Sequence, residues 1–251
     1  MELSEYGEAL SYEVAFWMQG LTEPTYPLEE LGQLSLDVSQ KLRALAVMTL
    51  LVQGDTDIFY HQLIRSGRAR ETYLQRITAG GLSGDHHQAS GRFDALVDAI
   101  AANDFDLARR IIDLSLSQMH VGHEYEDDFF YAQTLHGLVH PSHEGNLQPI
   151  LAQWETFLDG EECPRFAVCQ TLVDKNQDDF DEKFDELLDG WDTKLEEADV
   201  EGPLLQALQL VFVEGLAILR IAEHRGLETL ADYRYCPSLA RIPMVKPFVE
   251  E

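Results

Sequence analysis

Positive charge is scarce in this chain. Its 251 residues contain 18 lysines and arginines against 45 aspartates and glutamates, which gives a formal net charge of −27 at neutral pH. Phosphate backbones and anionic membrane surfaces repel a protein of this charge, so nucleic acid and membranes are excluded as partners. A basic protein is the partner that such a surface attracts, because the field of the whole molecule raises the rate of encounter.

Cysteine is also rare, with three residues, Cys163, Cys169 and Cys236, and no CxxC spacing among them. This count excludes a disulfide scaffold and a cysteine zinc site, and it is typical of a reducing compartment. The first residues are acidic and lack the basic start and the continuous apolar core of a signal peptide. We therefore expect a cytoplasmic protein.

Long apolar runs and strand patterns are missing as well. The most apolar stretch, residues 204–222, is interrupted by four polar residues, Gln206, Gln209, Glu214 and Arg220. This interruption predicts a buried helix rather than a membrane span. No segment shows the strict alternation of a half-buried strand. We predict an all-α fold of stacked antiparallel helices, arranged as αα-hairpins or a bundle of about nine or ten helices.

Glycine, proline and polar turns divide the chain into segments of helical periodicity. The expected helices span residues 2–19, 28–53, 57–78, 92–102, 105–118, 124–139, 147–158, 164–175, 176–201 and 204–224. A further helical turn is expected near Leu230, and Arg65, Arg68, Arg70 and Arg76 are expected on the outer face of their helix. We predict one all-α domain over residues 1–251, which the Gly-Gly-Leu-Ser-Gly break at 80–84 can subdivide into 1–79 and 85–251.

The expected helix at 176–201 is the most acidic part of the chain. Its apolar residues recur every three or four positions, at Phe180, Phe184, Leu187, Leu188, Trp191 and Leu195. This spacing places them on one face of the helix, which we expect to dock on the helix at 204–224. The remaining circumference is carboxylate, with only Lys183 and Lys194 to oppose it.

Two sets of residues are candidates for contact with a basic partner. The first set lies on the acidic helix: Asp178, Asp179, Asp181, Glu182, Asp185 and Glu186. The second set opens the helix at 124–139: Glu124, Glu126, Asp127, Asp128 and the aromatic Tyr125. Each set has a plainer interpretation, because a charged helix face is usually only solvated and carboxylates in a first turn offset the helix dipole.

Patterns that would carry catalysis are weak. His120, His123 and Glu124 could form the centre of a metal-dependent hydrolase, but their spacing is not that of the HExxH motif. The glycines at 80–84 lack the lysine of a phosphate-binding loop. We therefore expect no enzyme, no metal and no cofactor. A third alternative is a helical-repeat adaptor, because the segments beginning at Phe93 and Phe166 echo one another.

The segment FVEGLAILRIAEHRGLETLADYRYCPSLARIP, residues 212–243, resembles the end of the immunity protein 49 (Imm49) family of bacterial polymorphic toxin systems. The resemblance is carried by Glu214, Gly215, Ala222, Arg225, Gly226, Leu227, Tyr235, Cys236 and Pro237. The immunity family of the PoNe DNase toxins is similar in character and is the second choice. The resemblance implies a non-enzymatic protein that binds a cognate toxin, such as a basic nuclease, and covers its active site during competition between bacteria. We expect it to be a monomer rather than a homodimer.

Overall fold

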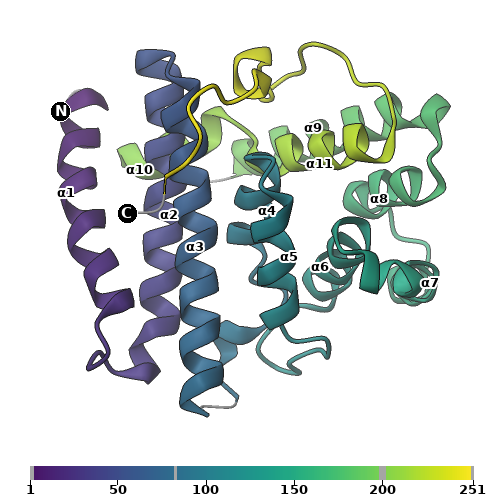
Figure 1. The fold of residues 1–251 in the computed structure, drawn as a ribbon. Coiled ribbons are helices and arrows are strands. Elements are labelled where there is room, and N and C mark those ends of the chain that lie inside the picture. The colour runs from purple at the N-terminus through teal and green to yellow at the C-terminus, as the bar shows by residue number, and fades with distance from the viewer. Residues whose placement is uncertain (1–2, 82–83, 198–201, 250–251) are drawn as a thin grey trace.

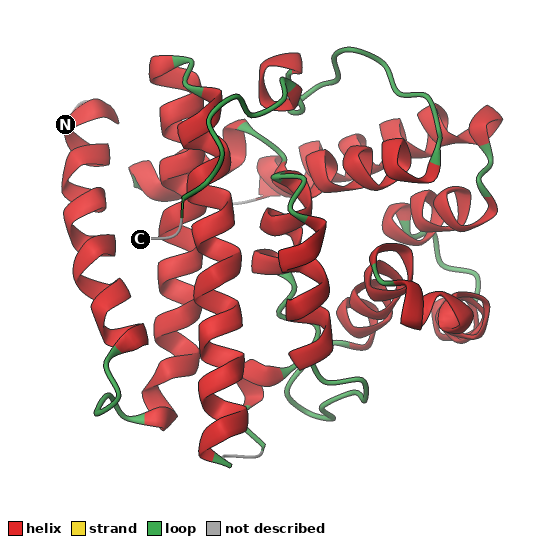
Figure 2. Ribbon diagram, viewed as in Figure 1, coloured by secondary structure: helices red, strands yellow, loops and turns green. Residues whose placement is uncertain are grey.

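The computed structural model describes residues 3–81, 84–197 and 202–249. Within these ranges the chain forms eleven α-helices, three short 3-10 helices and no β-strand (Figures 1 and 2). An isolated antiparallel bridge joins Tyr233 to Cys236 in the C-terminal tail. The all-α prediction is confirmed. The helices exceed the expected number because residues 204–224 form two helices instead of one.

Three long helices form one side of the molecule: α1 (Leu3–Thr22), α2 (Leu28–Gln53) and α3 (Thr56–Gly80) (Figure 1). The turn from α2 to α3 is short because Gly54 adopts a positive φ of 67°, which ends α2 in a left-handed cap. Asp55 then caps α3, and its side chain accepts a hydrogen bond from the backbone of Ile58 at 2.9 Å.

Two helical hairpins follow the same design. The first joins α4 (Asp94–Ala101) to α5 (Phe105–Leu114), and the second joins α8 (Pro164–Asp174) to α9 (Gln177–Glu197). Each turn contains one residue with positive φ, Asn103 at 61° and Lys175 at 53°. In each, the next backbone N–H donates to a carbonyl five residues earlier at 2.9 Å. The echo in the sequence therefore corresponds to two hairpins with the same turn.

Helices α6 (Glu126–Val139) and α7 (Leu147–Leu158) lie between these hairpins and are joined by the 3-10 helix η2 (Pro141–Asn146). Helix α6 packs against α5, α7 and α8. Nine of its residues are buried, on several sides of the helix. Another 3-10 helix, η1 (His86–Gln88), precedes α4 and packs on α2.

The apolar stretch near the C-terminus is broken into α10 (Pro203–Leu210) and α11 (Val213–Arg225), so the prediction of a single helix was wrong. At the break Val211 is extended, and the backbone N–H of Phe212 donates to Tyr235 of the tail at 2.8 Å. By length and composition residues 204–225 are apolar enough to cross a membrane, but 56% of this apolar window is buried within the protein. Helix α11 packs on α4 and buries eight of its residues, whereas α10 packs on α2 but leaves Leu205 and Leu210 exposed.

The C-terminal tail, residues 226–249, crosses from α11 back to α3. Its one 3-10 helix is η3 (Ser238–Arg241), so the helical turn predicted near Leu230 was placed too early. The Tyr60 hydroxyl of α3 donates to the carbonyl of Ala240 at 2.7 Å, and Asp57 accepts from the backbone of Val245 at 2.6 Å. These bonds fasten the end of the chain to its N-terminal helices.

The acidic helix α9 buries Phe180, Phe184, Leu187 and Leu188 of its predicted apolar stripe, whereas Trp191 and Leu195 are only partly buried. Its principal neighbour is α8, with a smaller contact on α11, so the expected docking on residues 204–224 was wrong for the main contact. The hairpin turn at Lys175 and Asn176 places α9 directly beside α8. Residues 198–201 of the predicted helix lie outside the described residues.

Candidate functional site

The carboxylates on the outer side of α9 form a surface that we call the acidic face: Asp178, Asp179, Asp181, Glu182, Asp185, Glu186, Asp189 and Asp192. Asp178, Asp179 and Glu182 are exposed. Lys183 lies among these carboxylates, 2.6 Å from Glu186 and 3.2 Å from Glu182. One lysine cannot balance so many carboxylates at helical spacing, so their repulsion persists in the folded protein.

One arginine of the C-terminal tail, Arg234, contacts the acidic face. The Arg234 guanidinium lies 2.5 Å from Asp189, 2.6 Å from Asp192 and 3.3 Å from Asp185. Arg234 remains about half exposed, so solvent and salt weaken these pairs. The carboxylates raise the pKa of Arg234, chiefly through the hydrogen bond to Asp189.

Two tyrosines of the tail extend this contact. The hydroxyl of Tyr233 donates to Asp181 at 2.7 Å, and the hydroxyl of Tyr235 donates to Asp192 at 2.5 Å. Burial, with the Asp181 hydrogen bond as a further contribution, raises the pKa of Tyr233 to about 12, so it stays a donor at neutral pH. The tail therefore engages part of the acidic face, while its N-terminal carboxylates stay open to solvent.

The second predicted set is divided by the structure. Glu126 and Tyr125 face solvent, with Tyr125 80% exposed. Glu124 instead accepts hydrogen bonds from the backbone of Gly91 at 2.7 Å and of His120 at 2.6 Å.

The other two carboxylates of this set are also used within the fold. Asp127 accepts from the indole nitrogen of Trp154 at 2.8 Å. Asp128 pairs with Arg165 at 3.2 Å. With Glu124, they connect the start of α6 to α7, α8 and the loops around it.

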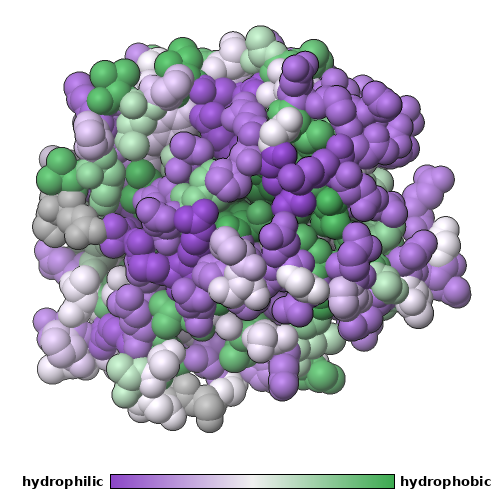
Figure 3. Space-filling view, turned by 45° about the vertical axis from the view of Figure 1, so that its right-hand side comes forward, coloured by the Kyte–Doolittle hydropathy of each residue, from purple (hydrophilic) through white to green (hydrophobic). Residues whose placement is uncertain are grey.

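Arginines serve mainly inside the fold. The prediction that Arg70 lies on the outer face of α3 was wrong: it is 2% exposed and donates to the carbonyls of His87 and Ala89. Arg76 donates to backbone carbonyls of the α1–α2 connection. Because the few cations are used in this way, the surface is left strongly anionic. On the face shown in Figure 3, hydrophilic residues predominate and hydrophobic residues form separate patches.

Seven of the nine histidines gather in two places. The rings of His120 and His123 lie 4.4 Å apart, and His86 adds a third ring 5.9 Å from His123. Both oxygens of Glu124 accept backbone hydrogen bonds, so a metal ion bound with His120, His123 and Glu124 would have to displace these bonds.

In the second cluster of histidines, Nε2 of His140 lies 3.4 Å from Asp113, and the ring of His143 lies beside that of His140. His140 Nδ1 accepts the backbone N–H of Ser142 at 3.1 Å, so Nε2 carries the proton in the neutral ring. A metal ion bound to Nε2 would move the proton to Nδ1, and Nδ1 could then no longer accept the hydrogen bond from Ser142. These contacts describe two hydrogen-bonded loops.

A polar cleft of about 480 Å³ opens between α2, α4, α9 and the junction of α10 with α11. Its apolar wall includes Leu36, Leu208 and Val211. The Trp191 ring of α9 stacks on Phe212, with 4.6 Å between centroids. Trp191 and Phe212 also line a smaller cavity of about 200 Å³. We refer to the larger space as the polar cleft.

Ion pairs of Arg43 line the polar cleft, and the one with Asp98 is buried. Arg43 Nε donates to Asp98 at 2.6 Å, and Arg43 also pairs with Asp94 at 2.9 Å. Burial raises the pKa of Asp98 to about 6, although Arg43 and the hydroxyl of Ser66 oppose the shift. The Arg43 pKa is raised because its two aspartates outweigh its burial. Because Asp98 lies so close to Arg43, we expect it to be ionised at neutral pH.

A second ion pair joins α8 to α11. Arg165 binds both oxygens of Glu214, each at 2.7 Å. The guanidinium also lies over the rings of Phe93 and Tyr131, 5.2 Å and 4.8 Å from their centroids. Its carboxylates raise the pKa of Arg165, so it remains a cation at every accessible pH.

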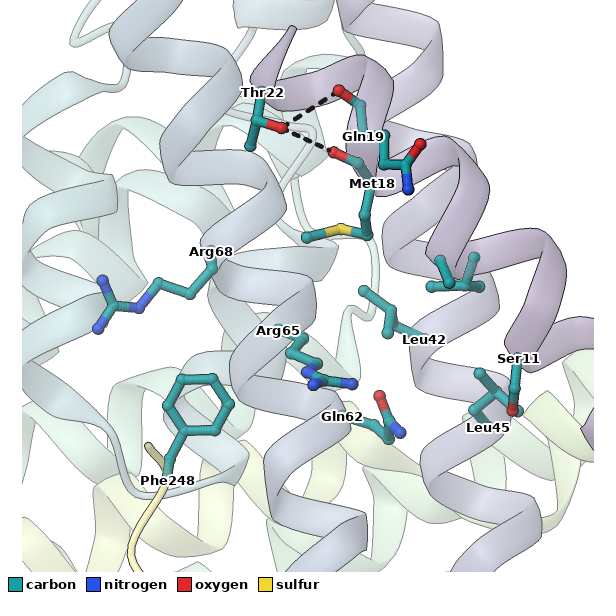
Figure 4. Close-up of a pocket in the computed structure, with 12 residues that line it drawn as sticks. Ser11, Met18, Gln19, Thr22, Leu42, Leu45, Gln62, Arg65, Arg68 and Phe248 are labelled. Carbon is teal, nitrogen blue, oxygen red and sulfur yellow. Dashed lines mark hydrogen bonds between the residues drawn. The ribbon is translucent and has the colours of Figure 1, made fainter. Parts of the chain in front are cut away.

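Another cavity, of about 560 Å³, lies between α1, α2, α3 and the tail. In Figure 4 Arg65 lies between Leu42 on one side and Phe248 on the other, and Met18 closes the cavity from α1. Thr22 is held at the end of α1 by hydrogen bonds to the carbonyls of Met18 and Gln19.

The model of the family Imm49, immunity protein 49, matches residues 34–240. The chain belongs to this family. The resemblance noted at residues 212–243 is confirmed as the first of the two immunity families considered. No curated protein and no solved structure matches the chain. The family is one of immunity proteins of toxin systems.

The range of the Imm49 match includes some of the surfaces described above and leaves others out. The acidic face lies inside the matched range, as does the polar cleft except for Gln33. Helix α1 and Phe248, which form walls of the cavity in Figure 4, lie outside it. A function common to Imm49 proteins is therefore better sought at the acidic face and the polar cleft.

The sequence prediction missed the polar cleft. Its signals were charged residues within apolar segments: Arg43 interrupts the apolar part of α2, and Asp98 stands in the apolar helix α4. A charge at such a position needs a partner, but the pairing of two residues 55 positions apart is visible only in the fold.

Proposed function

We propose that this Imm49 protein binds a basic toxin in the cytoplasm and neutralises it by covering the toxin's active site. Family membership supports the role of an immunity protein. One observation carries the charge preference: most arginines are used within the fold, while Asp178, Asp179 and Glu182 stay exposed. A nuclease fits this surface, because a protein that binds phosphate must present positive charge.

The open carboxylates of the acidic face make the first contact in this proposal. Asp181, Asp185 and Glu186 add to the attractive field although Tyr233, Arg234 and Lys183 contact them. Lys183 also lies 3.2 Å from Glu182, which stays exposed. Glu126 and the exposed ring of Tyr125 supply a smaller second contact, in which the ring acts as an anchor. A stable complex of this kind buries about 1,600 Å² in total.

Neutralisation by occlusion requires one immunity protein per toxin and no catalytic step. The proposal therefore includes no enzymatic activity, no cofactor and no nucleic acid or membrane partner. Since the net charge of −27 makes two copies repel one another, we propose that the free protein is a monomer.

The test is to neutralise the open carboxylates with Asp178→Asn, Asp179→Asn and Glu182→Gln in one variant. Association with the toxin encoded beside this protein is measured by stopped flow at several salt concentrations. We expect association to slow by about tenfold at low salt, with the difference shrinking as salt screens the field. Dissociation should change less, because exposed charges act mainly on encounter.

The matched control removes the same charge elsewhere, by Glu8→Gln, Glu29→Gln and Glu30→Gln on exposed positions of α1 and α2. We expect this control to slow association by less than about threefold. Equal slowing in both variants would show that net charge matters and the acidic face does not. A wild-type protein that neither binds the toxin nor protects cells from it would disprove the immunity function itself.

A further inference from the structure

Three of the four carboxylates that line the polar cleft are already paired with arginines, while Asp37 is exposed and accepts a hydrogen bond from Gln33 at 2.7 Å. Asp94 and Asp98 are held by Arg43, and Glu214 is held through both oxygens by Arg165. A cationic ligand entering the cleft would have to compete with these arginines for its acceptors. These three carboxylates are therefore poor acceptors for a lysine or arginine side chain.

The lining of the cleft also includes two donor groups, on Arg92 and Trp191, that have no acceptor among the described residues. Among the arginines of the described residues, Arg92 is the one whose guanidinium makes no ion pair or hydrogen bond, and it lies exposed on the lining of the cleft. The indole Nε1 of Trp191 is buried and has no partner within the described structure. A buried N–H without an acceptor is unfavourable, and a ligand oxygen would relieve it.

The charge of the cleft differs from that of the whole molecule. Four arginines and four carboxylates line it, whereas the chain has 18 basic and 45 acidic residues. The arginines are Arg43, Arg70, Arg92 and Arg165, and the carboxylates are Asp37, Asp94, Asp98 and Glu214. An anionic group repelled by the acidic face would meet a balanced field here.

We infer that the polar cleft receives an aspartate or glutamate side chain of the toxin. Its carboxylate accepts hydrogen bonds from the Arg92 guanidinium and from Trp191 Nε1, and its methylene groups lie against Leu36 and Leu208. The cleft, at about 480 Å³, also has room for part of the loop that carries this side chain.

This inference rests on the proposed function and adds the chemistry of the toxin's anchor. Trp191 lies on the apolar side of α9 and the acidic face lies on its outer side, so separate segments of the toxin contact the two. The complementary surface is basic at its edge and carries a carboxylate within it. A nuclease that holds its metal ions with carboxylates beneath bound phosphate has this charge pattern.

The test compares three variants in affinity for the toxin at physiological salt. Arg92→Glu reverses the free cation, and we expect Kd to rise by about 30-fold or more, since a charge-assisted bond is replaced by repulsion. Trp191→Phe keeps the ring stack on Phe212 but removes the N–H, and should raise Kd by about fivefold through faster dissociation. Thermal unfolding verifies that each variant is folded.

Lys246→Glu is the matched control, because it makes the same charge change on an exposed residue of the tail outside the Imm49 match. We expect it to raise Kd by less than about threefold. Reversing each acidic residue of the toxin to lysine should then identify one toxin variant that binds Arg92→Glu better than wild type.

Several results would overturn the inference. Arg92→Glu binding as tightly as Lys246→Glu removes the cleft from the interface and leaves the acidic face in place. Acetate that quenches the Trp191 fluorescence in an Arg92-dependent way, with toxin affinity unchanged by Arg92→Glu, shows a small-anion site instead. A wild-type protein that does not bind the toxin overturns both this inference and the proposed function.

Discussion

Residues 124–128, which lead into α6 and form its first turn, look like the acidic face of α9 in sequence, since both segments mix carboxylates with aromatic residues. In the fold they serve different purposes. Glu124, Asp127 and Asp128 turn toward neighbouring elements and accept their hydrogen bonds. Asp178 and Asp179 point to solvent. The density of carboxylates in a segment therefore does not tell whether they hold the fold together or attract a partner.

The two sets of carboxylates have different roles because different elements pack against the two helices. The start of α6 is surrounded by the preceding loop, Trp154 of α7 and Arg165 of α8, all of which offer donors. Helix α9 is covered by α8 and α11 on its apolar side, and on its outer side the tail supplies the Arg234 contact. Buried pairs and exposed pairs consequently coexist in one acidic molecule.

The largest change in the free energy of unfolding is expected when a buried ion pair is removed, and an exposed pair provides the comparison. Arg165→Ala leaves Asp128 and Glu214 without their cation in a largely buried place, and should lower the free energy of unfolding by about 3–5 kcal/mol. Arg234→Ala removes three pairs on the exposed acidic face and should cost less than about 1 kcal/mol. Urea unfolding of both variants measures the two values. Equal losses would mean that the tail contact is as structural as the buried pair.

Acid sensitivity gives the next effect, and we expect it to originate in α6. Burial lowers the pKa of His136 from 6.5 to about 3, with His143 and His140 adding to the shift. Below pH 6.5, His136 therefore binds a proton in the unfolded chain but stays neutral in the folded chain. The stability that neutral His136 contributes is complete above pH 6.5 and is lost as the pH falls toward 3, by about 1.4 kcal/mol per pH unit.

Urea midpoints between pH 7 and pH 4 measure this slope. His136→Gln should flatten it, because the titrating group is gone, whereas Asp178→Asn on the acidic face should leave it unchanged. An unaltered slope in His136→Gln would place the acid sensitivity elsewhere in the molecule.

The smallest effect separates two neighbours at the start of α6. Glu124→Ala leaves the backbone N–H groups of Gly91 and His120 without their acceptor, and should cost about 1–3 kcal/mol of unfolding free energy. Glu126→Ala changes an exposed residue and should cost less than about 0.5 kcal/mol. If both variants lost the same stability, negative charge near the start of α6 rather than these two hydrogen bonds would account for the role of Glu124.

Helical periodicity made much of the fold predictable, because the pattern of apolar residues along one helix is a local property. The stripe of Phe180, Phe184, Leu187 and Leu188 was read directly from its spacing and is buried. The boundary at residues 211–212 was missed because the tail supplies the partner for the freed backbone of Phe212. That partner, Tyr235, is distant in sequence.

The sequence by itself determined three things: an all-helical chain, a large excess of negative charge, and membership of the Imm49 family. The tertiary structure decided which charges remain outside. It turned Arg70 inward, placed Arg234 on the acidic face, and joined Arg43 to Asp98 across 55 residues. The physical reason is that spacing fixes the side of a helix on which a residue lies, while the packing of distant elements fixes what that side meets.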